Sequence, residues 1–199
     1  MTEYGLKERV AVLTITRDGL ADKLVERLVE EGCLLAILDH GEIQGKKLNE
    51  KIRREGGTSI LKQVDLTNKK AVGECFEAIW DYYGHLDFLV NEAEIHNSLS
   101  FLAEISTEQW NQVLQLNLKG TFLACQEAVK FMRAQKFGRI INLSSTVSLD
   151  FPPCYGAYAI SKLGINALTE VLAKEEAKHN IRVNAVALGS VSTDPSALY

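Results

Sequence analysis

The chain has 199 residues, of which 46% are hydrophobic and 24% charged, as is ordinary for a soluble globular protein with a core of its own. Its net charge of −4 offers no basic surface of the kind that binds nucleic acid. No run of about 18 apolar residues predicts a membrane span, and the N-terminus lacks the basic-then-apolar order of a signal peptide. We therefore expect a single domain over residues 1–199, located in the cytoplasm.

Short apolar runs alternate along the chain with segments of helical periodicity. Uninterrupted apolar runs are typical of strands buried on both faces. Segments with helical periodicity are typical of the helices that cover such strands. The predicted strands are residues 9–15, 33–39, 59–64, 86–91, 138–143 and 181–187, and the predicted helices are residues 19–31, 43–55, 68–83, 107–135 and 154–179. This alternation predicts the α/β class, with a doubly wound parallel sheet and right-handed crossovers.

The four cysteines predict neither a metal site nor a redox pair. Cys33, Cys75, Cys125 and Cys154 form no Cys-x-x-Cys motif and no cluster with histidine at metal-ligand spacing. We expect free thiols that are buried or partly buried.

Polar residues follow several of the predicted strands, where parallel sheets bind their ligands. The segment 15–21, Asp39, Asp65, Asn91 and Ser145 all lie at such carboxyl ends. We therefore expect the functional site at this edge of the sheet.

Tyr158 and Lys162 are the strongest candidates for chemistry. They lie four residues apart, which places them on one face of the predicted helix over 154–179. An ammonium beside a phenol favours the phenolate, lowers the pKa of the tyrosine and allows it to act as a general acid or base. Because many helices carry such a pair by chance, a surface contact is the alternative interpretation.

These motifs together resemble the short-chain dehydrogenase/reductase family over nearly all of residues 9–194. The resemblance implies a Rossmann fold with strand order 3-2-1-4-5-6 and a catalytic set of Asn117, Ser145, Tyr158 and Lys162. Tyr158 would exchange a proton with the substrate oxygen and Ser145 would orient that oxygen. Lys162 would bind the nicotinamide ribose, and Asn117 would bend its helix and hold a water that links to Lys162.

The resemblance also implies a set of residues that contact NAD. Asp39 lies twenty residues after Gly19, and a carboxylate there would bind ribose hydroxyls and repel the 2′-phosphate of NADP. Asp65 matches the adenine contact and Thr193 the contact to the cofactor amide. For Asp39 a helix or turn cap, and for Asp65 an N-cap of the helix near residue 68, remain alternatives. The complete set is Thr14, Gly19, Leu20, Asp39, Asp65, Leu66, Asn91, Tyr158, Lys162, Gly189, Val191 and Thr193.

Two departures from the family pattern lie on the cofactor side. The first turn reads Thr14-Ile15-Thr16-Arg17-Asp18-Gly19-Leu20-Ala21, so only the middle glycine of a three-glycine motif remains. Ile15 resists positive φ and fills space near the cofactor, and Asp18 repels a pyrophosphate at the helix N-terminus. After the fourth strand the family glycine is replaced by Glu94, which adds bulk and negative charge where the adenosine ribose approaches. NAD remains the expected cofactor, and Ile15, Asp18 and Glu94 leave weak binding and no binding open as alternatives.

Two functions remain open from the sequence. The first is an NAD-dependent oxidoreductase that acts on an alcohol or carbonyl substrate. The second is a cofactor-free, non-catalytic partner subunit of a hetero-oligomer. The resemblance implies association, as a homo-oligomer or hetero-oligomer, through the helices near 107–135 and 154–179. It also implies a substrate lid and a seventh strand, which the sequence up to Tyr199 does not contain; we expect a truncated chain or an omitted tail.

Overall fold

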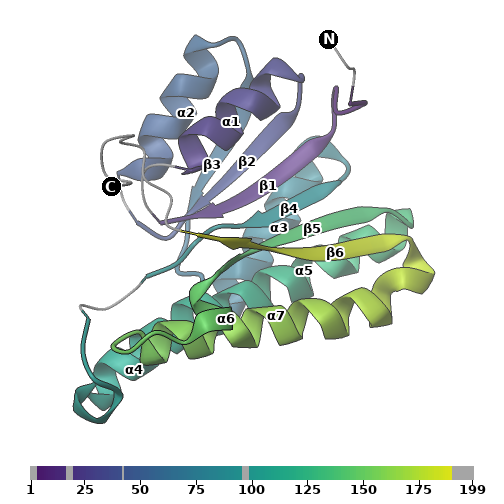
Figure 1. Cartoon of the computed structure of the whole chain (residues 1–199). Coiled ribbons are helices and arrows are strands. Elements are labelled where there is room, and N and C mark those ends of the chain that lie inside the picture. Colours follow the sequence, from purple (N-terminus) through teal and green to yellow (C-terminus); the bar gives the residue numbers. More distant parts are fainter. Residues whose placement is uncertain (1–3, 17–19, 42, 96–98, 190–199) are drawn as a thin grey trace.

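One parallel sheet of six strands organises the molecule (Figure 1). The structure is a computed structural model that describes residues 4–16, 20–41, 43–95 and 99–189. The strand order is β3-β2-β1-β4-β5-β6. The strands are β1 (Val10–Ile15), β2 (Leu34–Asp39), β3 (Thr58–Gln63), β4 (Phe88–Asn91), β5 (Gly138–Ser145) and β6 (Ile181–Leu188). The predicted α/β class, parallel sheet and strand order are confirmed.

Helices cover both faces of this sheet (Figure 1). One face carries α1 (Leu20–Glu30) and α2 (Gln44–Arg54), and the other carries α3 (Lys69–Tyr83), α5 (Thr121–Gln135) and α7 (Gly156–Glu176). Two shorter helices are α4 (Thr107–Val113) and α6 (Val147–Asp150), and 3-10 turns span Leu102–Glu104 and Ala177–His179. Among the described residues, no helix is both long and apolar enough to cross a membrane.

Strand β1 shows how the sheet divides the core into two layers. All six of its side chains are buried, and because successive side chains point to opposite faces, they alternate between the layers. Val10 and Val12 pack with residues of α3 and α5, whereas Ala11, Leu13 and Ile15 pack with residues of α1 and α2. The continuous apolar run of this strand is therefore explained by burial on both faces.

The segment predicted as one helix over 107–135 contains a change of helical type. It begins at Thr107 as predicted, and the preceding Ser106 side chain accepts a hydrogen bond from the Gln109 amide in a capping box. Residues Leu114–Gly120 then form a π-helix, η2, before α5 begins. The prediction of one regular helix is wrong here, because the wider turn brings Asn117 to backbone partners outside the helix, as described below.

Glu176, at the end of α7, ties that helix to α5. Its side chain is 1% exposed and pairs with Arg133, whose Nε donates to Oε2 at 2.7 Å. These hydrogen bonds hold the pKa of the Glu176 carboxyl below its usual value. Since the folded-state pKa is lowered, the stabilisation is present above the unfolded-state pKa of about 4.3 and is lost as the pH falls through the folded-state pKa.

We expect Glu176→Gln to lower the free energy of unfolding at pH 7 by about 1.5 kcal/mol, because Arg133 loses a charged partner. The difference from the unmodified chain should shrink when the pH falls below about 4. Urea titrations at both pH values measure it. Glu170→Gln is the control, since Glu170 makes an exposed pair with Lys174 on the same helix and should not change stability measurably. An equal effect of both variants would contradict the structural role of Glu176.

Candidate active site

Helix α7 holds Tyr158 and Lys162 one turn apart at the carboxyl ends of the strands. The Lys162 side chain is only 2% exposed, and its Nζ lies 5.6 Å from the centroid of the Tyr158 ring. The same Nζ donates to the carbonyl oxygen of Leu143 in β5 at 2.7 Å. Because a buried ammonium requires oxygen partners, the end of β5 and the pitch of α7 together fix this charge beside the phenol.

A third side chain, Glu94, meets this pair from the loop after β4. Its Oε2 accepts a hydrogen bond from the Tyr158 hydroxyl at 3.0 Å. The same oxygen forms an ion pair with Lys162 Nζ. The Glu94 side chain is 18% exposed, so this ion pair is largely shielded from water. The sequence placed Glu94 near the adenosine ribose, whereas its carboxylate lies on the candidate proton-transfer pair.

The backbone of Glu94 is held by Thr16, which follows β1. The Thr16 hydroxyl donates to the Glu94 carbonyl oxygen at 2.7 Å and accepts from the Glu94 amide at 3.1 Å. Sequence analysis did not single out Thr16, because its role depends on β1 and β4 being neighbours in the sheet. This two-way contact fixes where the Glu94 side chain begins.

Asn117 holds the next residue of the same loop. Its Oδ1 accepts from the Ile95 amide and its Nδ2 donates to the Ile95 carbonyl oxygen, both at 2.8 Å. Nδ2 also lies 3.2 Å from the hydroxyl oxygen of Ser161 on α7. Asn117 therefore lies among the candidate residues, and its described contacts connect η2 to the Glu94 loop and to α7.

Ser145 ends β5 and is also buried at this edge of the sheet. Its Oγ accepts from the Val147 amide at 3.3 Å, and its carbonyl oxygen accepts from the Ser148 hydroxyl at 2.6 Å. Both contacts belong to the start of α6, a helix that the sequence did not predict. The Ser145 backbone pairs with Leu188 of β6. The exposed Gly189 follows Leu188 and therefore lies at the same edge of the sheet.

Two predicted cofactor contacts, Thr14 and Asn91, belong to a buried polar network. The Thr14 hydroxyl donates to Asn91 Oδ1 at 3.3 Å, and Asn91 Nδ2 donates to Asn142 Oδ1 at 2.8 Å. Asn142 Nδ2 then donates to the Thr169 hydroxyl at 2.8 Å. The network joins β1, β4, β5 and α7 through groups that would be costly to bury without partners. Asn142 and Thr169 escaped sequence analysis, because only the assembled sheet brings them together.

Cys125 borders this network as a protonated thiol. Asn91 Nδ2 lies 3.3 Å from its sulfur, and complete burial raises the pKa of the thiol to about 12. All four cysteines are free thiols, as the sequence predicted. Among the described residues, no group of three or more His, Cys, Asp and Glu side chains could hold a metal ion.

Asp39 lies at the carboxyl end of β2, but its carboxylate turns into the following loop. Oδ1 accepts from the Gly41 amide at 2.8 Å and Oδ2 from the Gly45 amide at 2.7 Å. A Cβ at position 45 would lie 2.7 Å from Asp39 Oδ2, so glycine is what allows this approach. These contacts agree with the interpretation of Asp39 as a turn cap.

Asp65 and Leu66 lie beside the end of β2. Asp65 Oδ1 accepts hydrogen bonds from the amide and the hydroxyl of Thr67. The hydroxyl contact is the main reason why the pKa of this carboxyl lies below its usual value. Leu66 is buried, and its amide donates to His40 Nδ1 at 3.1 Å. The alternative of Asp65 as the helix cap is wrong, because Asn68 caps α3.

The first turn is described in part. Ile15 is the last residue of β1, fully buried in the layer under α1, and its φ is not positive. Leu20 is the first residue of α1 and is partly buried. Four residues to which the sequence analysis gave a role at the cofactor, Asp18, Gly19, Val191 and Thr193, lie outside the described residues.

The site therefore combines a phenol, a buried ammonium and a carboxylate that touches both. A phenol beside an ammonium can pass a proton to or from an oxygen atom. The Glu94 carboxylate acts as a stand-in here, since it shows that the pair accepts an oxygen ligand between the hydroxyl and the ammonium. A sugar hydroxyl or a substrate oxygen could take the same position once the carboxylate has left it.

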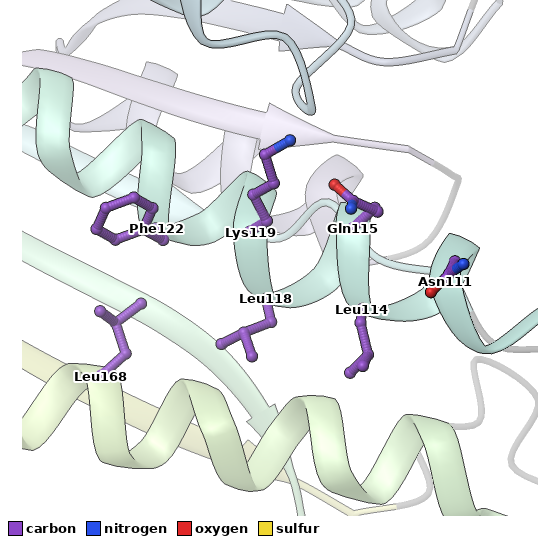
Figure 2. A pocket seen from close by; sticks show the side chains of 7 residues that line it. All are labelled: Asn111, Leu114, Gln115, Leu118, Lys119, Phe122 and Leu168. Atoms are coloured by element: carbon purple, nitrogen blue, oxygen red, sulfur yellow. The ribbon is translucent and has the colours of Figure 1, made fainter. Parts of the chain in front are cut away.

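Away from this site, a hollow of about 490 Å³ lies between η2, α5 and α7 (Figure 2). Leu114 and Leu118 point toward α7 and Leu168 points back toward η2, whereas Lys119 points away (Figure 2). The hollow is completed by Asn111, Gln115 and Phe122. It involves none of the candidate catalytic side chains.

Comparison with known proteins identifies relatives over most of the chain. The chain is 32% identical over 197 residues to the 3-oxoacyl-[acyl-carrier-protein] reductase FabG of Aquifex aeolicus, covering 98% of this chain and 79% of that protein. It is 28% identical over 191 residues to glucose 1-dehydrogenase 2 of Bacillus subtilis, covering 95% and 74%.

A solved structure, described as the crystal structure of NAD+-bound xylitol dehydrogenase, superposes with a TM-score of 0.89 at 30% identity, covering 95% of this chain and 73% of that one. The profile of the family described as short chain dehydrogenase matches residues 9–197. The relatives and the profile agree with the parallel sheet and with the resemblance that the sequence motifs indicated. The chain belongs to the short-chain dehydrogenase family.

Proposed function

We propose that this protein is an oxidoreductase that interconverts an alcohol and its carbonyl compound, with NAD(H) as the cofactor. The observation that carries this proposal is the buried Lys162 ammonium beside the Tyr158 ring, with the Tyr158 hydroxyl directed at an oxygen acceptor. Tyr158 exchanges the proton with the substrate oxygen, and Lys162 stabilises the phenolate. The family membership and the relatives named as a reductase and a dehydrogenase support the same reaction class.

Two further residues complete the proposed catalytic set. Ser145, buried at the end of β5, orients the substrate oxygen through its hydroxyl. Asn117 acts as a positioning residue, because its side chain holds the backbone of Ile95 and lies against Ser161 on α7. Neither role requires a group to ionise, so these residues set the geometry in which Tyr158 exchanges its proton.

The residues that would hold NAD are Lys162 and Tyr158 at the nicotinamide ribose, and Asp39 at the adenosine ribose. When bound, this cofactor supplies or accepts the hydride. The Asp39 carboxylate disfavours the 2′-phosphate of NADP, which is the reason for proposing NAD. Thr14, Gly19, Leu20, Asp65, Leu66, Asn91, Gly189, Val191 and Thr193 complete the proposed contacts, of which Thr14 and Asn91 act through the buried network that supports β1 and β4.

The direct test is a titration of the purified protein with NADH, followed by turnover assays on carbonyl compounds. The panel follows the chemistry named for the relatives: a 3-oxoacyl thioester and the carbonyl compounds related to glucose and xylitol. We expect binding with a Kd in the micromolar to millimolar range and turnover of at least one compound. No binding at about 5 mM NADH and no turnover would contradict the proposed function.

A second candidate is a cofactor-free partner subunit of a hetero-oligomer, favoured by the Glu94 carboxylate on Lys162 and Tyr158. Such a subunit would shape an active partner without turning over substrate. Isolation of the protein from its native source discriminates the two. A homogeneous oligomer of this chain with activity supports the enzyme, whereas constant stoichiometry with a related, active chain supports the partner subunit.

Both candidates use association through the outer faces of α4, α5 and α7. Phe122 on α5 is 42% exposed and Leu163 on α7 is 44% exposed. The hollow in Figure 2 lies between η2, α5 and α7. We expect Phe122→Glu combined with Leu163→Glu to dissociate the oligomer, because charged groups would be desolvated at the contact. Light scattering after size-exclusion chromatography measures the mass. Tyr82→Glu, at an exposed aromatic residue of α3, should leave the mass unchanged; the same mass for the double variant would contradict this interface.

A further inference from the structure

The Glu94 contact has the features of a built site for a carboxylate. One oxygen of Glu94 meets two donors on successive turns of α7, the Tyr158 hydroxyl and the Lys162 ammonium. Lys162 is 2% exposed and has a further acceptor in the Leu143 carbonyl oxygen. Breaking this ion pair by removing Glu94 would leave a buried ammonium without its anionic partner, which is costly.

The backbone of Glu94 and of Ile95 is held by side chains from two other parts of the fold. Thr16 makes two hydrogen bonds to the Glu94 backbone, and Asn117 makes two to the backbone of Ile95. The direction in which the side chain leaves the backbone is therefore set by β1 and η2. The side chain itself has rotatable bonds, and rotation about them is the movement that would free the pair.

We propose that Glu94 is an internal ligand of the Tyr158–Lys162 pair, which holds the pair closed to the hydroxyl groups of a dinucleotide ribose until the Glu94 side chain swings away. The part of this proposal that concerns the dinucleotide rests on the proposed function. The carboxylate competes because a ribose hydroxyl would need the same ammonium. Affinity for the cofactor is then reduced by the fraction of molecules in which the pair is closed.

The first test measures the contact in the protein without cofactor. Glu94→Gln, Lys162→Met and the double variant form a cycle of urea unfolding experiments. We expect each single variant to raise the unfolding equilibrium constant, and the double variant to raise it about tenfold less than the product of the two single effects. A coupling below about twofold would show that the two charges do not interact and would overturn the proposal.

A second measurement keeps the test valid if the Lys162 variant does not fold. Acetate offers the carboxylate that Glu94→Gly has lost. We expect sodium acetate to raise the unfolding temperature of Glu94→Gly relative to sodium chloride at equal ionic strength. Glu77→Gln, an exposed residue of α3, is the control that should show no such difference. An equal response of both variants would count against a carboxylate site.

The third measurement uses NADH as the probe for the closed pair. We expect Glu94→Gly to bind NADH at least about tenfold more tightly than the unmodified chain and Glu94→Gln to lie between them, with Glu77→Gln unchanged. Equal affinities of the unmodified chain and Glu94→Gly would overturn the proposal and leave the proposed function intact. Acetate rescue and charge coupling without NADH binding to any variant would instead support the internal ligand and refute the proposed NAD dependence.

Discussion

Tyr158→Phe is expected to lower turnover by about a thousandfold or more, because the variant lacks the hydroxyl that we propose exchanges a proton with the substrate oxygen. The ring, its packing and its position on α7 are retained. Loss of the hydrogen bond to Glu94 should reduce stability by about 1 kcal/mol at most. The measurements are kcat/KM on a carbonyl compound that the unmodified chain reduces, and a urea titration.

Tyr155→Phe is the matched control for this experiment. Tyr155 lies just before α7 and carries the same side chain, but the residue four positions later is Ala159 and not a lysine. We expect its turnover to remain within about threefold of the unmodified chain. Persistent activity of Tyr158→Phe would place the proton donor elsewhere, and a large loss in both variants would point to a general disturbance of the helix start.

Ile15→Gly is expected to lower the free energy of unfolding by about 4 kcal/mol, the largest stability effect that we predict. Deletion of a buried isoleucine side chain leaves a cavity, and glycine adds a backbone entropy cost in a strand. Ile15 is fully buried at the end of β1 and packs with residues such as Ala21 and Val25 of α1. A urea titration measures the effect. Ile15→Val is the control, with an expected loss of about 1 kcal/mol.

The buried position of Ile15 changes how the replacement of a family glycine at position 15 is interpreted. The sequence alone indicated that Ile15 fills space near the cofactor and would therefore weaken NAD binding. The structure gives Ile15 a role in the core, so any gain in affinity would be measured in a destabilised protein. If Ile15→Gly lowers the free energy of unfolding by less than about 1.5 kcal/mol, the side chain does not make the core contact described for it. The interpretation that Ile15 obstructs the cofactor would then be supported.

The position of Glu94 separates two causes of weak cofactor binding. A chain with a damaged phosphate cradle binds the cofactor weakly whatever the state of its catalytic pair. A chain with an internal carboxylate has a sound pair that is closed, and it recovers when the carboxylate is removed. The contact of Glu94 with Tyr158 and Lys162 favours the second description for this protein.

The sequence by itself determined the fold, because its signals are local or periodic. Apolar runs marked all six strands to within two residues at each end, and helical periodicity marked the start of α4 at Thr107. The spacing of Tyr158 and Lys162 already placed them on one face of a helix, since that relation is set by helix pitch alone. Neither the π-helical turn at Asn117 nor the short helix α6 was predicted, because both depend on hydrogen bonds formed outside a regular helix.

Only the tertiary structure decided which side chains meet. Glu94 and Lys162 lie 68 residues apart in the sequence, and they become neighbours because β4 and β5 are adjacent in the sheet and α7 packs beside β5. The same adjacency joins Asn91 to Asn142, and the turn after β2 directs Asp39 to its own backbone. A residue type at one position specifies what a side chain can bind, whereas the long-range packing of the sheet determines the partner that it finds.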